Sequence, residues 1–359
     1  MNGDTLFVSK KAHGRINLMG RHVDHQGGYY NMILIDKYVQ CDMCKSKSLS
    51  TTIIVKSCGD QQKYSCDVDD IALRDNWSKY VIAPLIYLNE KYDLRDQINK
   101  HTYHINIWGN IPQGAGLSSS SALVVACAKC FIELFNIENI NNFTLINDCC
   151  DAEKLIGTGG GSGDHASIIL GKPNIITKIK MFPDIAIENT VNKPEKLEIY
   201  IYHSGVKATK GTGNCNQRFN DKVKCYDVGF EYLDKEKYLN DLSEESLTKI
   251  KELNNENVIN VMKYGYREYN RSNNFYLMCL NNDYEGIGKM VKQSMLDEQM
   301  LYKCSCNEID HMVEMANNID GVLGAQICGA GMGGCLAIFA LKGTSVINVF
   351  KNYDLIAIV

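Results

Sequence analysis

The sequence lacks the features that would place it in a membrane or on a nucleic acid. No apolar run approaches the roughly 20 residues that a bilayer span needs, and residues 1–14 contain no signal-peptide core. Basic residues are not in excess, because 38 Lys and Arg stand against 42 Asp and Glu, whereas proteins that bind nucleic acids are usually basic. We therefore expect a cytoplasmic protein without a membrane or nucleic-acid partner. We further expect a monomer or a homodimer.

Several catalytic signatures and a disulfide framework are missing as well. The chain has no Gly-Lys-Ser/Thr of a P-loop, no His-x-x-Glu-His set and no nucleophile elbow. Its 15 cysteines are an odd number, and without an export signal we expect reduced thiols that pack as small apolar side chains. Two C-x-x-C pairs, Cys41/Cys44 and Cys127/Cys130, do not favour zinc, because one lies in a strand-like segment and the other in an apolar helix.

The most informative segment that is present runs from Asn110 to Phe135. Gly114 and Gly116 have no Cβ, so the backbone there can turn sharply and approach a ligand closely. Four serines follow, and then a stretch that is apolar on almost every side, which predicts a buried helix. The positive end of a helix after a glycine loop favours an anion, usually phosphate. A glycine turn with a serine N-cap and no ligand is the alternative.

A polar loop near the N-terminus carries further candidate ligands. Residues 15–19 read as a short strand, and the loop Gly20–Gly28 contains Arg21, His22, Asp24 and His25. Arginine suits phosphate, and aspartate can accept hydrogen bonds from sugar hydroxyls. A solvated polar loop without a ligand is the alternative.

Two more segments have the composition of ligand-binding turns. A helix from about Asn142 carries Glu153 and ends at a glycine run, residues 157–163, which Asp164 follows; Asp164 can also be read as a simple helix N-cap. Four glycines in the segment 329–334 join two strand-like runs, either as a wall for phosphates or as an ordinary hairpin.

The length and a change in composition predict two domains. A chain of 359 residues exceeds one ordinary domain, and residues 211–274 are more polar, charged and helical than what precedes them. We place the domains at residues 1–190 and 191–359.

Together these segments supply what phosphoryl transfer needs: a cradle for nucleotide phosphates, a divalent ion, an oriented acceptor hydroxyl and neutralised charge. The glycine–serine loop suits the phosphates, and Glu153 with a helix-start serine offers the oxygen ligands that Mg²⁺ prefers. Asp164 could accept the proton of the acceptor, and Arg15 could stabilise the developing charge.

At this point a family resemblance can be named. The segment from Gly14 to Asp24 resembles the sugar-binding signature of galactokinases, and Pro112 to Ser120 resembles the phosphate loop of the GHMP kinase superfamily. Gly329 to Cys335 resembles the third motif of that superfamily, and Trp77 to Val81 is also galactokinase-like. The motifs occur in the order of the family and span nearly the whole chain.

The resemblance implies an α+β fold of two domains, the first like ribosomal protein S5 domain 2 and the second ferredoxin-like. It implies an ATP- and Mg²⁺-dependent sugar kinase that acts at the anomeric hydroxyl, or a catalytically silent sugar and nucleotide sensor. Asp164 and Arg15 would be catalytic, and Ser120 and Glu153 would bind Mg²⁺. The substrate would contact Arg21, His22, Asp24 and Gly161. The nucleotide would contact Gly114, Gly116, Leu117, Ser118, Ser119, Ser120 and Ser121.

The chain departs from the galactokinase signature in its sugar loop. Arg21 stands where the family has an acidic residue that contacts the C6 hydroxyl of the sugar, His25 replaces a usual Tyr, and Met19 replaces a usual Ile. Because arginine favours carboxylate or phosphate, one hypothesis is a substrate with an acidic or altered C6 end. The alternative is that Arg21 turns outward or pairs with a carboxylate of the protein.

Overall fold

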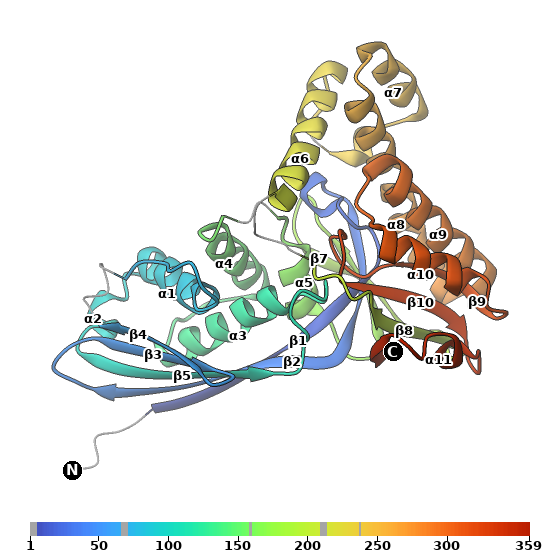
Figure 1. Ribbon diagram of the computed structural model, residues 1–359. Coiled ribbons are helices and arrows are strands. Elements are labelled where there is room, and N and C mark those ends of the chain that lie inside the picture. The colour runs from blue at the N-terminus through green and yellow to red at the C-terminus, as the bar shows by residue number, and fades with distance from the viewer. Residues whose placement is uncertain (1–5, 66–70, 158–159, 209–213, 237) are drawn as a thin grey trace. The chain divides into compact units, whose positions relative to one another are not determined.

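The computed structural model describes residues 6–65, 71–157, 160–208, 214–236 and 238–359 (Figure 1). The chain forms two compact units: unit 1 comprises residues 1–14, 36–111 and 118–169, and unit 2 comprises residues 15–35, 112–117 and 170–359. The long strands β1 (Leu6–Met19) and β2 (Tyr29–Lys47) each run through both. Since these units interleave along the chain, the single boundary at residues 190/191 stays a prediction.

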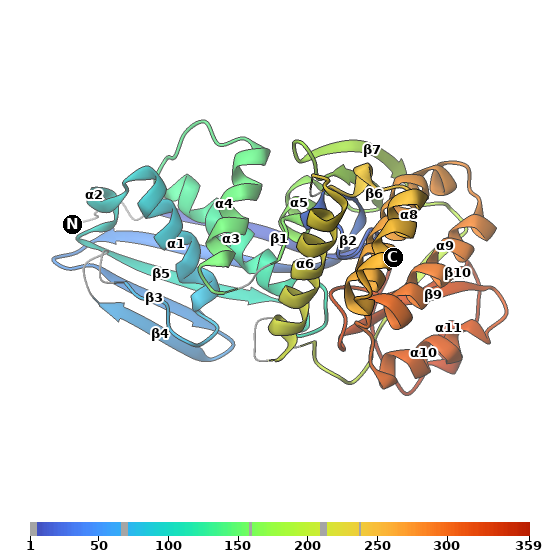
Figure 2. The same ribbon diagram turned by 90° about the horizontal axis from the view of Figure 1, so that it is seen from above.

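Unit 1 is a sheet with helices on one face. Its strands are β3 (Thr52–Ser57), β4 (Asp60–Ser65), β5 (His101–Gly109) and the second half of β2, in the order β4-β3-β5-β2, together with the first part of β1, which pairs with β2. Helices α1 (Lys79–Tyr92), α3 (Ser119–Leu134) and α4 (Asn142–Lys154) lie on one face (Figures 1 and 2). The short helices α2 (Arg95–Ile98) and α5 (Gly163–Leu170) belong to the same unit.

Strand β5 and helix α3 form as the sequence predicts. In β5 the alternating Tyr103, Ile105 and Ile107 are buried, which fixes the face of the strand that meets the helices. Helix α3 is buried along most of its length, as its apolar composition predicts.

Cysteines fill part of the unit 1 core. The thiol of Cys127 lies 3.7 Å from that of Cys41 on β2, and the Cys130 thiol donates to the Cys41 carbonyl at 3.3 Å. All three are buried, and burial raises the pKa of the Cys41 thiol. Cys44 lies three residues along the strand and so points to the opposite face, where it is only half-buried. The cysteines that the structure describes are free thiols.

Unit 2 contains two sets of strands. The first half of β2 pairs with β6 (Ile175–Lys180), which pairs with β7 (Ala186–Asn192), all antiparallel. A separate antiparallel sheet has the order β11-β8-β10-β9, from β8 (Leu197–His203), β9 (Val322–Ile327), β10 (Cys335–Leu341) and β11 (Asp354–Ile358).

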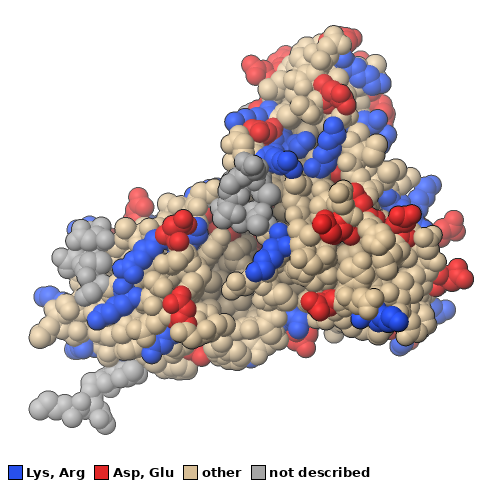
Figure 3. All heavy atoms as spheres, in the orientation of Figure 1, with Lys and Arg blue, Asp and Glu red and all other residues tan. Residues whose placement is uncertain are grey.

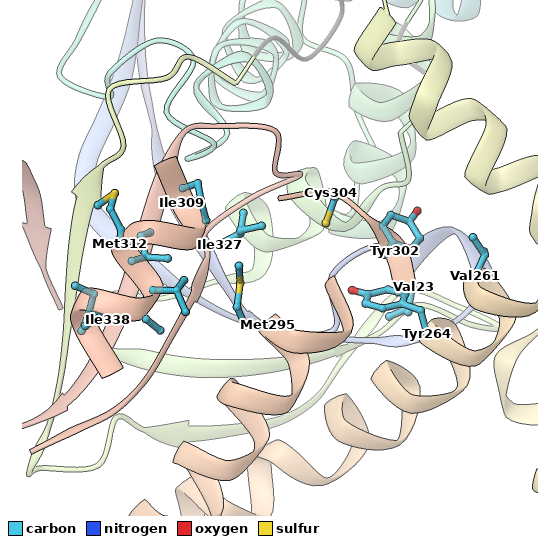
Figure 4. Close-up of a cluster of buried hydrophobic side chains, with 14 of the residues drawn as sticks. Val23, Val261, Tyr264, Met295, Tyr302, Cys304, Ile309, Met312, Ile327 and Ile338 are labelled. Atoms are coloured by element: carbon cyan, nitrogen blue, oxygen red, sulfur yellow. The ribbon is translucent and has the colours of Figure 1, made fainter. Parts of the chain in front are cut away.

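The helices of unit 2 bury their apolar faces against that sheet and against one another. They are α6 (Asn214–Leu233), α7 (Glu244–Lys249), α8 (Glu256–Leu280), α9 (Tyr284–Asp297), α10 (Asn307–Asn317) and α11 (Val346–Val349). Helices α9 and α10 pack on β9, and α6 and α9 pack on α8. Figure 4 shows side chains of the resulting core, which include Met295, Ile309, Ile327 and Ile338.

The predicted mixture of helices and strands is confirmed, and the exceptions have physical reasons. Strand β8 has the predicted bounds, whereas β4 was not predicted, because its polar sequence carries no apolar alternation and it lies at the edge of the unit 1 sheet. No helix within the described ranges combines the length and apolar composition that a bilayer span needs. On the face shown in Figure 3, basic side chains are interspersed with acidic ones.

Candidate active site

The loop Gly20–Gly28 in unit 2 is packed into the protein rather than solvated. Gly20 has φ +101°, and a Cβ there would lie 2.0 Å from the carbonyl oxygen of Tyr29, so only glycine fits. Val23 is completely buried and lies with Tyr264 and Tyr302 in the core of the unit (Figure 4). The alternative of a solvated loop is therefore wrong. We refer to residues 20–28 as the sugar loop, after their predicted role.

Two predicted sugar ligands lie on fixed backbone in this loop. His22 adopts a left-handed conformation, with φ +58°, which a side chain keeps only where its surroundings hold it. Its ring stacks on Phe219 and on Tyr302, with centroids 5.3 and 4.5 Å away. Asp24 opens a short 3-10 helix, η1 (Asp24–Gln26), and is half-buried. Their contact with a sugar stays a prediction.

Arg21 is not available to a substrate, which corrects the hypothesis of an acidic sugar end. Its side chain is 2% exposed and forms an ion pair with Glu298, which is completely buried. The guanidinium also donates to Ser294 and Gln326, each at 3.0 Å, and to the carbonyl of Asn17 at 3.3 Å. The guanidinium thus faces protein groups on every side, so Arg21 pairs with a carboxylate of the protein, as the alternative reading proposed.

Burial and neighbouring charges shift the pKa values of both members of this pair. Burial lowers the pKa of Arg21, but Glu298 and Glu268 outweigh it and raise that pKa above its ordinary value. Burial raises the pKa of Glu298 to about 7; Arg21 opposes the shift and Glu268 adds to it. Glu268 itself is buried, yet Arg271 and Arg21 hold its pKa below the ordinary value. The site thus keeps two arginines charged among carboxylates that water does not reach.

The two glycine loops, far apart in sequence, meet backbone to backbone in unit 2. A Cβ on Gly329 would lie 2.4 Å from the carbonyl oxygen of Gly116, and the N–H of Cys335 donates to the Ala115 carbonyl at 2.9 Å. Arg15 is buried beside them, where its Nη1 donates to the Gly116 carbonyl at 3.0 Å. Arg15 and the two glycine loops therefore lie side by side in unit 2. Strands β9 and β10 pair antiparallel around the second loop, so that loop is also a hairpin.

In unit 1, the start of α3 faces a carboxylate. Ser118 precedes the helix with φ +61°, and its hydroxyl is buried and bound by no group among the described residues. The hydroxyl of Ser121 donates to Glu153 Oε2 at 3.0 Å. The serine that reaches Glu153 is therefore Ser121, one residue after the predicted Ser120. Leu117, Ser119 and Ser120 lie where the glycine loop becomes the helix, whose first amides have no acceptor within it.

A histidine that the sequence reasoning did not single out also binds Glu153. His165 Nε2 lies 2.8 Å from Glu153 Oε2, and the imidazole is 3% exposed. Burial lowers the pKa of His165, but Cys150 and Glu153 outweigh it and raise that pKa to about 9. The imidazole is therefore charged at neutral pH, where it forms an ion pair with Glu153.

Asp164 lies in the first turn of α5, not at its N-cap. The helix includes Gly163, and the N–H of Ala166 donates to the Ser162 carbonyl at 2.8 Å, so the cap is Ser162. Asp164 is half-buried, as is Gly161 before it. Thr158 and Gly159 of the predicted glycine run lie outside the described residues. The N-cap reading of Asp164 is wrong, and its catalytic role stays a prediction.

The carboxylates that bind Arg21 were missed because no local motif marks them. Glu268 and Arg271 do, however, fall on the buried face of α8, at helical spacing from Tyr264 and Phe275. Charged residues inside the apolar stripe of a helix are rarely buried without a partner. That position in the pattern was the available signal for Glu268; Glu298 had none.

Comparison with known protein families agrees with this geometry. Three family models match the chain: the galactokinase galactose-binding signature over residues 5–41, the GHMP kinase N-terminal domain over residues 79–172 and the GHMP kinase C-terminal domain over residues 277–353. The first contains the sugar loop, the second the serines, Glu153 and Asp164, and the third the hairpin of glycines.

Individual proteins resemble the chain over nearly its whole length. A galactokinase of Thermosipho africanus is 27% identical over 95% of this chain and 92% of its own. A galactokinase of Thermotoga maritima is 28% identical over 93% of this chain and 89% of its own. The crystal structure of Lactococcus lactis galactokinase complexed with galactose has the same fold, with a TM-score of 0.85 at 22% identity over 96% of this chain and 88% of its own. The chain belongs to the GHMP kinase superfamily, and within it to the galactokinase-like sugar kinases.

Proposed function

We propose that this galactokinase-like phosphotransferase transfers the γ-phosphoryl group of ATP to the anomeric hydroxyl of galactose. The observation that carries the proposal is the sugar loop: it lies in the segment that matches the galactose-binding signature, and it is fixed in a strained conformation by its surroundings. Strain of this kind is characteristic of ligand-binding segments. His22 and Asp24 hold sugar hydroxyls, and Gly161 lets the backbone approach the sugar.

ATP binds at the loop 114–121. Gly114 and Gly116 adopt left-handed turn conformations, and the start of α3, which follows them in the chain, offers amides and a positive dipole end to the phosphates. Contact between Gly116 and Gly329 supports this proposal, because two closely packed backbones restrict each other's movement. A phosphate cradle that is already rigid loses less entropy on binding.

The residues in unit 1 fit Mg²⁺. A magnesium ion bound together with nucleotide phosphates needs only one or two protein oxygens, and the structure offers the Glu153 carboxylate, the Ser121 hydroxyl beside it and the Ser118 hydroxyl that has no protein partner among the described groups. Glu153 and a helix-start serine, Ser120 or Ser121, would hold the ion. When bound, it would neutralise charge on the phosphates.

Two side chains handle the proton of the sugar hydroxyl and the charge of the transferred phosphoryl group. Asp164 accepts the proton of the sugar hydroxyl, or orients that hydroxyl, since a loose transition state needs little base assistance. Arg15 stabilises the charge of the phosphoryl group. Its guanidinium is held in place by the Gly116 carbonyl, so it is oriented without help from the substrate.

Two other readings gain no support. An acidic C6 end would need a cation directed at the substrate, and Arg21 is engaged by the protein. A silent sensor needs only binding, whereas the chain keeps Arg15, Glu153 and Asp164 alongside the nucleotide loop.

An ADP-release assay over a panel of sugars tests the proposal. We expect galactose to be phosphorylated far faster than glucose, galacturonate or galactose 6-phosphate, in the presence of ATP and Mg²⁺, and the product to resist further reaction at the anomeric carbon. No turnover with any sugar would remove the kinase function, and faster turnover of an acidic sugar would remove galactose as the substrate.

The predicted metal ligands can be separated in the same assay. Ser120→Ala and Ser121→Ala change one hydroxyl each on adjacent residues of α3. The variant that raises the Mg²⁺ concentration needed for half-maximal rate identifies the serine that acts with Glu153.

A further inference from the structure

Two consecutive residues of the sugar loop are tied to the same single turn of helix. Arg21 forms its ion pair with Glu298, the first residue of η5 (Glu298–Tyr302). His22 stacks on Tyr302, the last residue of that turn. One short element thus contacts both Arg21 and the next residue, His22, which is a predicted sugar ligand.

The backbone of the same residues is held from a second direction by α8. Glu268 accepts the N–H of Gly20 at 2.7 Å and that of Arg21 at 3.3 Å, and the hydroxyl of Tyr264 donates to the Arg21 carbonyl at 3.0 Å. Ser294 joins the two anchors, because its hydroxyl donates to Glu268 at 2.9 Å and accepts from Arg21. Every one of these side chains is buried.

We infer that Arg21 and Glu298 are positioning residues for sugar recognition: they hold the backbone so that His22 keeps its left-handed conformation and Asp24 its direction. This inference rests on the proposed function of the sugar loop. The chemistry of the arginine side chain supports the inference too. Its planar guanidinium donates to Glu298, Ser294 and Gln326 at once, so it fixes both the position and the orientation of the side chain at residue 21.

A stabilising role alone would not require this pair. Replacing a buried ion pair by apolar residues of similar volume is often neutral or stabilising, whereas removing one partner leaves a buried charge. A double substitution can therefore remove the fork and its carboxylate together without unfolding the protein. The double substitution can therefore test whether the pair positions the sugar loop, without a large loss of stability that would confuse the result.

The experiment compares wild type with Arg21→Met/Glu298→Leu and with Arg21→Lys. For the double variant we expect a melting temperature close to that of wild type, a KM for galactose raised about tenfold, and an unchanged KM for ATP, because a small misplacement of binding groups has large effects. Arg21→Lys keeps the charge and loses the fork, so we expect a smaller rise, about threefold, in the same KM only. Galactose affinity measured by calorimetry should follow the KM.

A matched control removes an ion pair in unit 1. Lys91→Met/Asp148→Asn deletes the pair between α1 and the buried Asp148 of α4, and should leave the KM for galactose unchanged. If the KM for galactose in both Arg21 variants stays within about twofold of wild type, the pair is only structural and the inference is overturned. If wild type itself phosphorylates no sugar, the proposed function has failed instead, so the two failures are distinguishable.

Discussion

Two carboxylates of unit 1, Glu153 and Asp164, and two of unit 2, Glu268 and Glu298, occupy opposite kinds of environment. Glu153 and Asp164 lie on α4 and α5, are partly exposed, and the described contacts of Glu153 are to Ser121 and His165. Glu268 and Glu298 are completely buried and held by arginines. The same chemical group thus serves two purposes: where water and ligands reach it, it can take part in a reaction, and where they do not, it fixes the backbone.

The largest effect that tests this comparison is on the rate. We expect Asp164→Asn to lower kcat by about 10²- to 10⁴-fold, the range typical of a lost general base, while the melting temperature and nucleotide affinity stay near those of wild type. Steady-state ADP release, thermal unfolding and calorimetry measure the three quantities. Asp96→Asn, at an exposed site in the same unit, is the control. Unchanged turnover would remove Asp164 from the mechanism.

The next effect is on stability. Glu268→Ala leaves Arg21 and Arg271 without a shared carboxylate in the core, so we expect the free energy of unfolding to fall by about 3–5 kcal/mol. Chemical denaturation measures it, and Glu314→Ala, at an exposed site on α10, should change it by less than about 0.5 kcal/mol. A loss in the Glu268 variant no larger than in its control would mean that the buried carboxylate does not hold the loop.

A smaller loss of stability is expected where the glycine loops meet. Gly329→Ala brings a methyl group within 2.4 Å of the Gly116 carbonyl oxygen, so one loop must move. We expect a cost of about 1–3 kcal/mol and a higher KM for ATP. Gly160→Ala, where a methyl group meets nothing within 4 Å, is the control for stability. Equal stabilities would show that the loops separate easily.

The smallest effect separates the two regions by pH. The pKa of His165 rises from 6.5 to about 9 in the fold, so its contribution is complete below pH 6.5 and is lost as the pH rises towards 9. The pKa of Glu298 rises from 4.5 to about 7, so the folded state favours the protonated carboxyl. Its contribution to the free energy of unfolding is complete below pH 4.5 and is lost as the pH rises towards 7. Denaturation from pH 4.5 to 9 measures both.

Neutral variants assign each pH window to its residue. His165→Gln should remove the fall in stability as the pH rises from 6.5 to 9 and leave the fall between pH 4.5 and 7. Glu298→Gln should remove the fall between pH 4.5 and 7 and leave the other. A decline that persists in both windows with both variants would mean that other groups titrate there.

Much of the fold could be predicted because local patterns determine it. The alternation of Tyr103, Ile105 and Ile107 and the apolar composition of α3 leave one buried arrangement each. Gly116 was recognisable as a turn position, and its φ of +72° is a conformation that residues with a side chain rarely adopt.

The remainder depended on partners far away in the chain. Whether Arg21 faces a substrate or the protein is decided by Glu298, 277 residues later, and nothing near either residue in sequence reveals the other. Ser120 and Ser121 are equally placed in sequence, and only the direction of α3 relative to α4 brings Ser121 to Glu153. His165 follows Asp164 directly, yet its partner is on another helix.

The cluster of Cys41, Cys127 and Cys130 has a consequence for handling the protein. In the native state these thiols are sheltered and, with their raised pKa, inert. Denaturation releases them together with the other cysteines of the chain, 15 in all, into solvent, where exchange and air oxidation join wrong partners. Recovery of folded protein after heating should therefore depend on added reductant. Without reductant, thermal unfolding should be irreversible even if the free energy of unfolding is high.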